Sequence, residues 1–407
     1  MRETEFKQTE IGLIPSDWEV KTIGDFTNVV TGATPNTKIS EFWGGNIRWM
    51  NSGELNLKRV HEVAGRITEL GYESASTFML PPYCVLIGLA GQGKTRGTAA
   101  INYVPLCTNQ SIAAFTPNDK FDSFFLYFFM DSQYENLRRI SSGDGGRGGL
   151  SKGLLEDYKV IFPPLPEQRK IAEVLSDFDE LIDSLSALIA KKENIKQGAM
   201  QELLTARRRL PGFTDPWVEK PLGEVTAMQS GGTPLSSNNE YYNGTIPFLS
   251  IGDMTAQNKW INYTANHISE SGLLNSSARM CAKGTLLYAM YASLGKCSIA
   301  NIDLAISQAV LGIDCKNIER DFLYYYLCFI EGKVVKMGQT GTQSNLSKQI
   351  VQEFIVPIPT PSEQRAIAAI LSDMDSEISA LKVERDKYLS LKQGAMQQLL
   401  CGKIRLV

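Results

Sequence analysis

The chain has 407 residues, 43% hydrophobic and 21% charged, which is typical of a globular protein with two or three domains. Its net charge of −3 requires any DNA-binding surface to be a local basic patch. The seven cysteines form no C-x-x-C pair, so with two histidines they predict no metal site and suggest reduced thiols in a cytoplasmic protein. We expect neither a signal peptide nor a membrane helix, because the N-terminus is charged and the most apolar run, Phe124–Met130, is short.

Residues 1–163 are predicted to form a first mixed α/β domain. They are rich in Gly, Pro, Asn, Thr and aromatic residues, and short apolar runs such as Tyr83–Leu89 indicate strands between turns. The longer run Phe121–Ile140 predicts a helix that precedes a glycine-rich loop.

Residues 164–209 are predicted to form a long helix, because they contain almost no Gly or Pro. Their apolar residues step by three and four, the spacing of a coiled-coil seam. The seam consists of Ile171, Leu175, Phe178, Ile182, Leu185 and Ile189. Such a stripe must be buried, either on the helix's own domain or, as we favour, against a second helix.

Residues 210–359 repeat the composition and the short apolar runs of the first domain. A strand is predicted at Thr285–Met290 and a helix at Arg320–Met337. Residues 360–407 then predict a second long helix, in which Thr360, Pro361 and Glu363 fit an N-cap, a first-turn proline and a capping box. Its seam consists of Ile367, Leu371, Met374, Ile378 and Leu381.

The two halves are copies of one another, offset by about 200 residues. The matches include Trp18 with Trp217, Thr34-Pro35 with Thr233-Pro234, Glu167-Gln168-Arg169 with Glu363-Gln364-Arg365, and Lys196–Gln201 with Lys392–Gln397. We therefore predict an α+β fold in which two mixed α/β domains, related by approximate two-fold symmetry, are separated by two long helices that form an antiparallel coiled coil.

Two stretches in each copy carry a resemblance to a known family. The helix starts read PLPEQRKIAEVLSDFDELI and TPSEQRAIAAILSDMDSEI, and the domain openings read GATPNTKISEFWGGNIRWMNSGE and GGTPLSSNNEYYNGTIPFLSIGD. In these stretches the chain resembles the specificity subunits of type I restriction-modification systems, from about Trp18 to Leu400.

The resemblance implies a non-catalytic subunit that needs no cofactor and binds double-stranded DNA. Each mixed domain would be a target recognition domain that reads one half of a split target. The helices would dock two methyltransferase subunits, and through them the restriction and translocase subunits, and would set the gap between half-sites. The helix residues expected to bind partners or pair with one another are the two seams and Glu167, Gln168, Arg169, Gly198, Glu363, Gln364, Arg365 and Gly394.

DNA contacts are expected from side chains with forked or planar donors and from lysines near phosphates. The candidates are Lys38, Arg48, Lys94, Arg96, Arg147, Lys152, Lys296, Gln343, Asn345 and Lys348. The family often has a Gly-Thr-Thr/Ser-Gln-x-x-Leu loop before the helix. The second copy keeps much of it at Gly341–Leu346, but the first copy has Gly143–Leu150, so the two loops need not contact DNA alike.

The strongest alternative is nucleotide binding, because Gly88–Thr95 matches the P-loop pattern G-x-x-x-x-G-K-[ST]. A P-loop opens a helix, whereas residues 96–104 read as a strand, and the second copy, aligned as Met290–Cys297, lacks the first glycine and the hydroxyl. A coiled-coil scaffold that binds no DNA is another alternative. Leu80–Tyr83 is similar to the [ND]-P-P-[YF] motif of amino-methyltransferases, but Leu80 cannot accept a proton.

Glycine inside both long helices suggests a close approach of backbones, with a simple helix break as the alternative. If Glu167 is level with Leu400, Gly198 lies opposite Ala369 and Gly394 lies near Ala172. Leucine at either glycine would then overpack the pair.

Overall fold

The computed structural model describes residues 5–91, 93–141, 149–340 and 345–406. It divides into two compact units, one formed by Met1–Ser186 with Val383–Val407 and the other by Ala187–Lys382. Each unit contains one mixed domain and part of both long helices, so each is described by itself as unit 1 and unit 2. The seven cysteines are free thiols.

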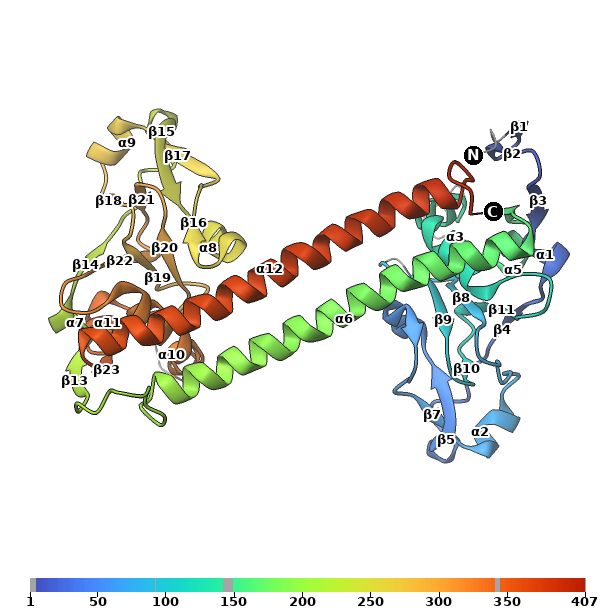
Figure 1. Ribbon diagram of the computed structural model, residues 1–407, viewed down its shortest axis with the longest axis horizontal. Coiled ribbons are helices and arrows are strands. Elements are labelled where there is room, and N and C mark those ends of the chain that lie inside the picture. Colours follow the sequence, from blue (N-terminus) through green and yellow to red (C-terminus); the bar gives the residue numbers. More distant parts are fainter. Residues whose placement is uncertain (1–4, 92, 142–148, 341–344, 407) are drawn as a thin grey trace. The chain divides into compact units, whose positions relative to one another are not determined.

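Unit 1 is built on a five-stranded sheet in the order β4-β11-β8-β9-β6 (Figure 1). These strands are β4 (Val29–Thr31), β6 (Arg59–Val60), β8 (Val85–Gly88), β9 (Ala99–Asn102) and β11 (Ile112–Phe115). The sheet is covered by α3 (Ser123–Ser132), which continues into α4 (Tyr134–Ile140). A second sheet, β10-β5-β7, holds β5 (Trp43–Met50), β7 (Arg66–Ile67) and β10 (Cys107–Thr108).

The remaining elements of unit 1 are short. The strand pairs are β1 (Phe6–Thr9) with β2 (Gly12–Pro15) and β3 (Glu19–Thr22) with β12 (Lys159–Phe162). The short helices are α1 (Ile23–Phe26), η1 (Ser40–Phe42), η2 (Ser52–Leu57), α2 (Glu69–Ser74) and α5 (Lys152–Glu156).

Unit 2 repeats this topology. Its five-stranded sheet, in the order β14-β22-β19-β20-β16, holds β14 (Thr226–Ser230), β16 (Trp260–Ile261), β19 (Leu286–Ala289), β20 (Cys297–Ala300) and β22 (Val310–Cys315). Its smaller sheet, β17-β15-β21-β18, holds β15 (Tyr242–Leu249), β17 (Asn266–Ile268), β18 (Arg279–Cys281) and β21 (Leu304–Ile306). The other elements are β13 (Val218–Pro221) paired with β23 (Ile355–Ile358), α7 (Leu222–Val225), η3 (Asn239–Tyr241), α8 (Ile251–Gln257), α9 (Glu270–Leu274), α10 (Arg320–Thr340) and α11 (Lys348–Gln352).

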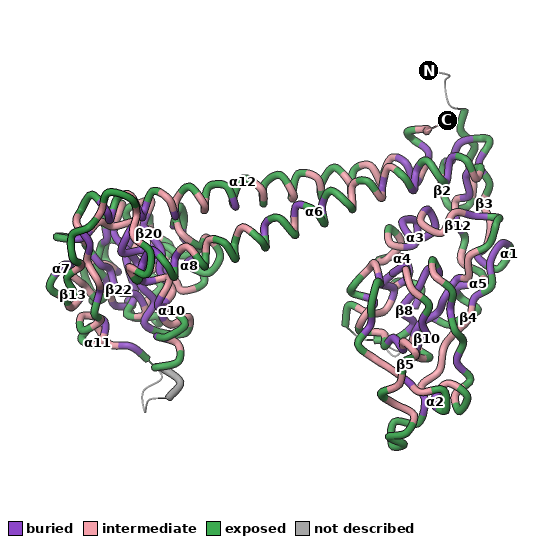
Figure 2. Tube along the Cα trace, turned by 60° about the horizontal axis from the view of Figure 1, so that its bottom comes forward, coloured by how far each residue is buried: buried purple, intermediate pink, exposed green. Residues whose placement is uncertain are grey.

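The predicted strands and helices of the two domains are confirmed. Each apolar run becomes a central strand, β8 (Figure 2) or β19, that is buried along its whole length. One difference lies in the first predicted helix, which is broken into α3 and α4 at Gln133. The side chain of Asp122 accepts the first free N–H groups of α3, as an N-cap residue does.

The two long helices are α6 (Leu165–Leu203) and α12 (Pro361–Leu399), each of 39 residues. The predicted seams are buried, apart from Phe178, Met374 and Leu381, which are half-buried. In unit 1, Leu175 shares a core with both the domain's Phe128 and Leu399 of α12. The seam therefore packs both on its own domain and on the other helix.

The helices run antiparallel within each unit. In unit 1, Asp179 of α6 pairs with Lys392 of α12 (2.5 Å), whereas Glu167, earlier on α6, pairs with Arg405, which follows α12 (2.7 Å). In unit 2, Lys196 pairs with Asp375, whereas Met200, further along α6, shares a core with Ile367, further back along α12. The predicted direction of the pair is confirmed in each unit taken by itself.

The predicted glycine contacts are wrong. The expected alignment places Lys392 opposite Leu175, and its ion-pair partner Asp179 lies four residues further along α6, an offset that a lysine side chain spans, so the register itself stays a prediction. Gly198 and Gly394 are both exposed, and a side chain placed at either would meet no atom within 4 Å. They therefore mark an open face of each helix and not a close approach of backbones.

Candidate nucleic-acid interface

In unit 1, the turn between β8 and β9 presents two of the predicted DNA-binding residues. Lys94 is exposed in this turn, and Arg96 is half-buried two residues later. Helix α4 holds the turn in place, because the Tyr134 hydroxyl donates a hydrogen bond to the carbonyl of Lys94 (3.1 Å). The Arg138 guanidinium donates to the carbonyl of Gly93 (2.6 Å). The main chain of the turn is thus fixed, while the ammonium of Lys94 remains in solvent.

This turn has the P-loop sequence but not the context that a P-loop needs. A P-loop leads into a helix, whereas Thr95 lies in a turn and the next element is the strand β9. Gly97 closes the hairpin with a φ of +82°, and its N–H donates to the carbonyl of Gly88 (2.9 Å). The geometry argues against nucleotide binding at this turn.

The corresponding turn of unit 2, between β19 and β20, is shorter. Gly295 closes it with a φ of +81° and is therefore the counterpart of Gly97. Lys296, which follows Gly295 and is half-buried, consequently corresponds to Thr98. The sequence alignment of Lys94 with Lys296 is wrong, because unit 1 has the longer turn.

The segment that follows each glycine-rich loop is joined to the same turn. In unit 1 the N–H of Leu150 donates to the carbonyl of Leu89 (3.0 Å), and in unit 2 the N–H of Leu346 donates to the carbonyl of Met290 (3.0 Å). The residues before α5 and α11 are therefore held beside the hairpin turns in the same way.

The predicted contacts in these segments differ in their surroundings. Lys152 is exposed at the start of α5 and pairs with Glu156 (3.5 Å). Asn345 is exposed, and Lys348 is half-buried at the start of α11. The predicted contacts Arg147 and Gln343 lie outside the described residues.

Lys38 and Arg48 lie in a different part of unit 1. Lys38 is exposed in the segment before η1, and Arg48 lies on β5 of the smaller sheet. The guanidinium of Arg48 makes two hydrogen bonds to the carboxylate of Glu62 (2.9 and 3.1 Å), which lower the pKa of Glu62 to about 2. Arg48 would have to leave this partner to read a base. Lys94 and Arg96 lie in the turn after β8, and the segment that leads to Lys152 is hydrogen-bonded to the same turn through Leu150, whereas Arg48 lies on the smaller sheet.

The start of α6, whose Glu-Gln-Arg sequence is repeated at the start of α12, is partly buried. Glu167 is buried and accepts hydrogen bonds from the indole of Trp18 (2.9 Å) and from the guanidinium of Arg405 (2.7 and 2.8 Å). Glu167 and Asp17 raise the pKa of Arg405, which also lies over the Trp18 ring. We call Trp18, Glu167 and Arg405 the unit 1 clamp. It ties the start of α6 to the segment that follows α12.

Unit 2 contains the same arrangement, the unit 2 clamp. Glu363 accepts from the indole of Trp217 (3.0 Å) and from the guanidinium of Arg209 (2.7 and 2.8 Å). The capping box predicted for α12 is thus only half formed. The N–H of Glu363 contacts the Thr360 hydroxyl at 3.5 Å, but the Glu363 carboxylate is committed to the clamp.

After the glutamate, each helix start has a buried glutamine followed by an exposed arginine. Gln168 is buried and accepts from the N–H of Asp122 (2.9 Å), and Gln364 does the same for Glu319 (2.7 Å). The following arginines are exposed, and neither has a hydrogen bond or ion pair among the described residues; these are Arg169 and Arg365. The glutamates and glutamines expected to contact partners are therefore internal ties, and the arginines alone point outward.

Sequence reasoning missed Arg209 and Arg405 and the two residues that hold the unit 1 turn, Tyr134 and Arg138. The arginines could have been found, because they are related by the same offset as the two helix starts. Nothing in the sequence signals Tyr134 and Arg138, because their partners are main-chain carbonyls about 40 residues away.

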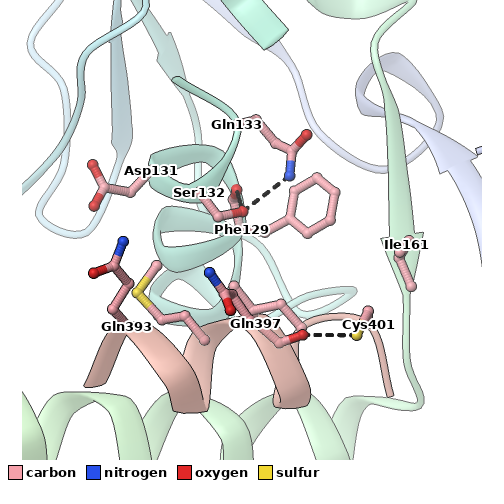
Figure 3. A pocket seen from close by; sticks show the side chains of 10 residues that line it. Phe129, Asp131, Ser132, Gln133, Ile161, Gln393, Gln397 and Cys401 are labelled. Carbon is pink, nitrogen blue, oxygen red and sulfur yellow. Dashed lines mark hydrogen bonds between the residues drawn. The ribbon is translucent and has the colours of Figure 1, made fainter. Parts of the chain in front are cut away.

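A pocket of about 480 Å³ lies in unit 1 between the end of α3, β12 and the end of α12 (Figure 3). Its lining includes Phe129, Ile161 and Gln397, and the one carboxylate among its lining residues, Asp131, is paired with Lys58 (2.6 Å). No group of three or more His, Cys, Asp or Glu side chains that could hold a metal occurs among the described residues. No described helix is long and apolar enough to span a membrane.

The chain is similar to known proteins along nearly its whole length. It is 25% identical to the putative type I restriction enzyme MjaX specificity subunit of Methanocaldococcus jannaschii, over 100% of this chain and 98% of that protein. It is 28% identical to the MjaIX specificity subunit of the same organism, over 99% and 97%. Its fold resembles the crystal structure of a type I restriction-modification system S subunit from M. genitalium, with a TM-score of 0.62 and 18% identity over 94% of this chain and 96% of that one.

The type I restriction modification DNA specificity domain matches the chain twice, over residues 15–196 and 214–388. Each match contains one mixed domain and most of the long helix that follows it. The chain therefore belongs to the family of type I restriction-modification specificity subunits.

Proposed function

We propose that the chain is the non-catalytic, DNA-reading subunit of a cytoplasmic restriction-modification enzyme, and that it recognises a split, asymmetric target in double-stranded DNA. Residues 1–163 and 210–359 are the two target recognition domains, and residues 164–209 and 360–407 are the helical regions. Two methyltransferase subunits dock on the helical regions, and the restriction and translocase subunits join through them.

One observation supports this proposal above the others: the same frame occurs twice with different exposed residues at its turns. Both units share a five-stranded sheet of the same order and a clamp at the helix start. At the hairpin turn, however, unit 1 has exposed Lys94 on a long turn, and unit 2 has half-buried Lys296 on a short one. Two domains with the same fold but different exposed residues are suited to bind two half-sites of different sequence.

The DNA contacts proposed for unit 1 are centred on Lys94, Arg96 and Lys152. For unit 2 they are Lys296, Asn345 and Lys348. Each helix of 39 residues is about 58 Å long at 1.5 Å per residue. That length exceeds one turn of B-DNA, so base pairs between the half-sites would remain unread.

Methylome sequencing of a strain that expresses the chain with its methyltransferase subunit tests the proposal. We expect modified adenines at a bipartite motif, with one modified base in each half and an unread spacer between them. A methylome without such a motif, although the assembled complex is present, would contradict DNA reading and favour a scaffold.

A further inference from the structure

Unit 1 exposes a tyrosine in a backbone conformation that tyrosine rarely adopts. Tyr83 has a φ of +67°, and its side chain is 45% exposed. Its N–H is held by the carbonyl of Asn102 (2.6 Å). The corresponding residue of unit 2 is Gly284, which has a φ of +98° and donates to the carbonyl of Ala300 in the same way (2.7 Å). Glycine is the unstrained choice at this turn, so contacts of the tyrosine ring have to offset the backbone strain.

The Tyr83 ring belongs to a cluster of four rings on the surface of unit 1, which we call the aromatic patch. Tyr103 is its centre: His61 stacks on Tyr103 at 4.1 Å between ring centroids, and Tyr83 meets its edge at 5.8 Å. Phe124 closes the cluster at 5.7 Å from Tyr83 and 5.9 Å from Tyr103. His61 is exposed and Tyr103 and Phe124 are half-buried, so part of each ring remains accessible.

Carboxylates on α6 lie beside the aromatic patch. The Asp183 side chain is 72% exposed and lies 3.7 Å from Arg59. Arg59 also pairs, more closely, with Asp179 (2.8 Å). Glu180 is exposed and has no ion pair among the described residues. Asp179 and Glu180 are close enough to Tyr103 to contribute to its raised pKa, for which burial is the main cause. The cations here, Arg59 and Lys392, both bind Asp179, so the accessible charge beside the rings is negative.

Accessible ring faces next to exposed carboxylates fit a cationic side chain. Aromatic faces attract Lys and Arg through their quadrupole, and a carboxylate at the rim adds a salt bridge. The same charge repels the phosphates of DNA. We propose that the aromatic patch of unit 1 binds an arginine or lysine side chain of the methyltransferase subunit, a proposal that rests on the function proposed above.

The patch is specific to unit 1. The positions that correspond to Tyr83, His61 and Tyr103 are Gly284, Asn262 and Asn301, as the matching main-chain hydrogen bonds of the strand ends show. The two methyltransferase subunits would therefore meet different surfaces, and the loss of the patch would affect the subunit next to unit 1.

Tyr83→Gly in the full chain is the decisive variant, because it removes the ring and relieves the backbone. We expect an unchanged or higher melting temperature together with a roughly three- to tenfold weaker affinity for the cognate methyltransferase subunit, the range of one cation–π contact. Asp183→Asn and Glu180→Gln should weaken the same affinity and reduce its dependence on salt. Phe78→Ala, at an exposed ring (54%) outside the patch, is the matched control and should change nothing.

The outcomes separate this inference from the proposed function. If the wild-type chain does not bind the methyltransferase subunit at all, the proposed function fails and the inference fails with it. If the wild type binds and Tyr83→Gly binds within twofold of it, the inference alone is wrong. If Tyr83→Gly keeps the methyltransferase subunit but the assembled complex loses affinity for DNA, the patch contacts DNA and the inference is overturned.

Discussion

Units 1 and 2 have the same larger sheet and the same buried contacts, but they differ in the exposed residues of their turns. The buried ties are shared: the Glu167 and Glu363 clamps, the Gln168 and Gln364 ties, and the hairpin glycine at Gly97 and Gly295. The exposed turns and rings are not shared. Burial therefore accounts for these shared ties, but exposed residues such as Arg169 and Arg365, or Gly198 and Gly394, are also the same in both copies.

The largest effect expected from a single substitution is at the clamps. Glu167→Ala leaves the guanidinium of Arg405, whose side chain is 13% exposed, with only its surface partner Asp17. Removing one member of a buried ion pair should destabilise unit 1 by about 3 kcal/mol. Chemical denaturation of this variant and of Glu363→Ala should give similar losses if the two clamps are equivalent. The control Glu173→Ala, on the exposed face of α6, should stay within about 0.5 kcal/mol of the wild type.

A smaller and opposite effect is expected at the two helix glycines. Because a side chain at Gly198 or Gly394 would meet no atom within 4 Å, alanine there removes the conformational cost of glycine without overpacking. Each variant should raise the stability of the isolated chain by about 0.5–1 kcal/mol. A loss of stability in Gly198→Ala would instead restore the close-approach interpretation drawn from sequence.

The hairpin turns should differ in their contribution to DNA affinity. Lys94→Ala removes an exposed cation on a fixed turn and should lower the slope of log affinity against log salt by about one. Lys296→Ala, on the shorter turn of unit 2, should lower the slope by less because Lys296 is half-buried. Equal slopes for the two variants would show that the turns are not used differently.

The smallest effect is expected at the Arg48–Glu62 pair, which is exposed. The lowered pKa of Glu62 means that the pair contributes above the ordinary carboxylate pKa of 4.5 and that this contribution is lost as pH falls towards about 2. Glu62→Gln should therefore slightly reduce the melting temperature at pH 7 and leave it unchanged near pH 2. A larger loss at acid pH than at pH 7 would contradict this assignment.

The sequence was sufficient for the repeated frame, because Trp18, Trp217 and the two helix starts keep their spacing. It was not sufficient for the surroundings of the helix glycines. A glycine inside a helix fits a close approach of another backbone, and only the fold shows that a side chain at Gly198 or Gly394 would meet no atom within 4 Å. It was also insufficient for Arg48, which is a plausible base reader until the fold brings Glu62 to it.

The most direct test of the account is a domain exchange followed by methylome sequencing. Residues 20–160 of this chain are replaced by those of a family member with a different known target, and the motif is compared with that of the unchanged chain. The account predicts that one half of the motif changes, while the other half and the spacer length stay the same. A change in both halves at once would contradict the claim that each unit reads its own half-site.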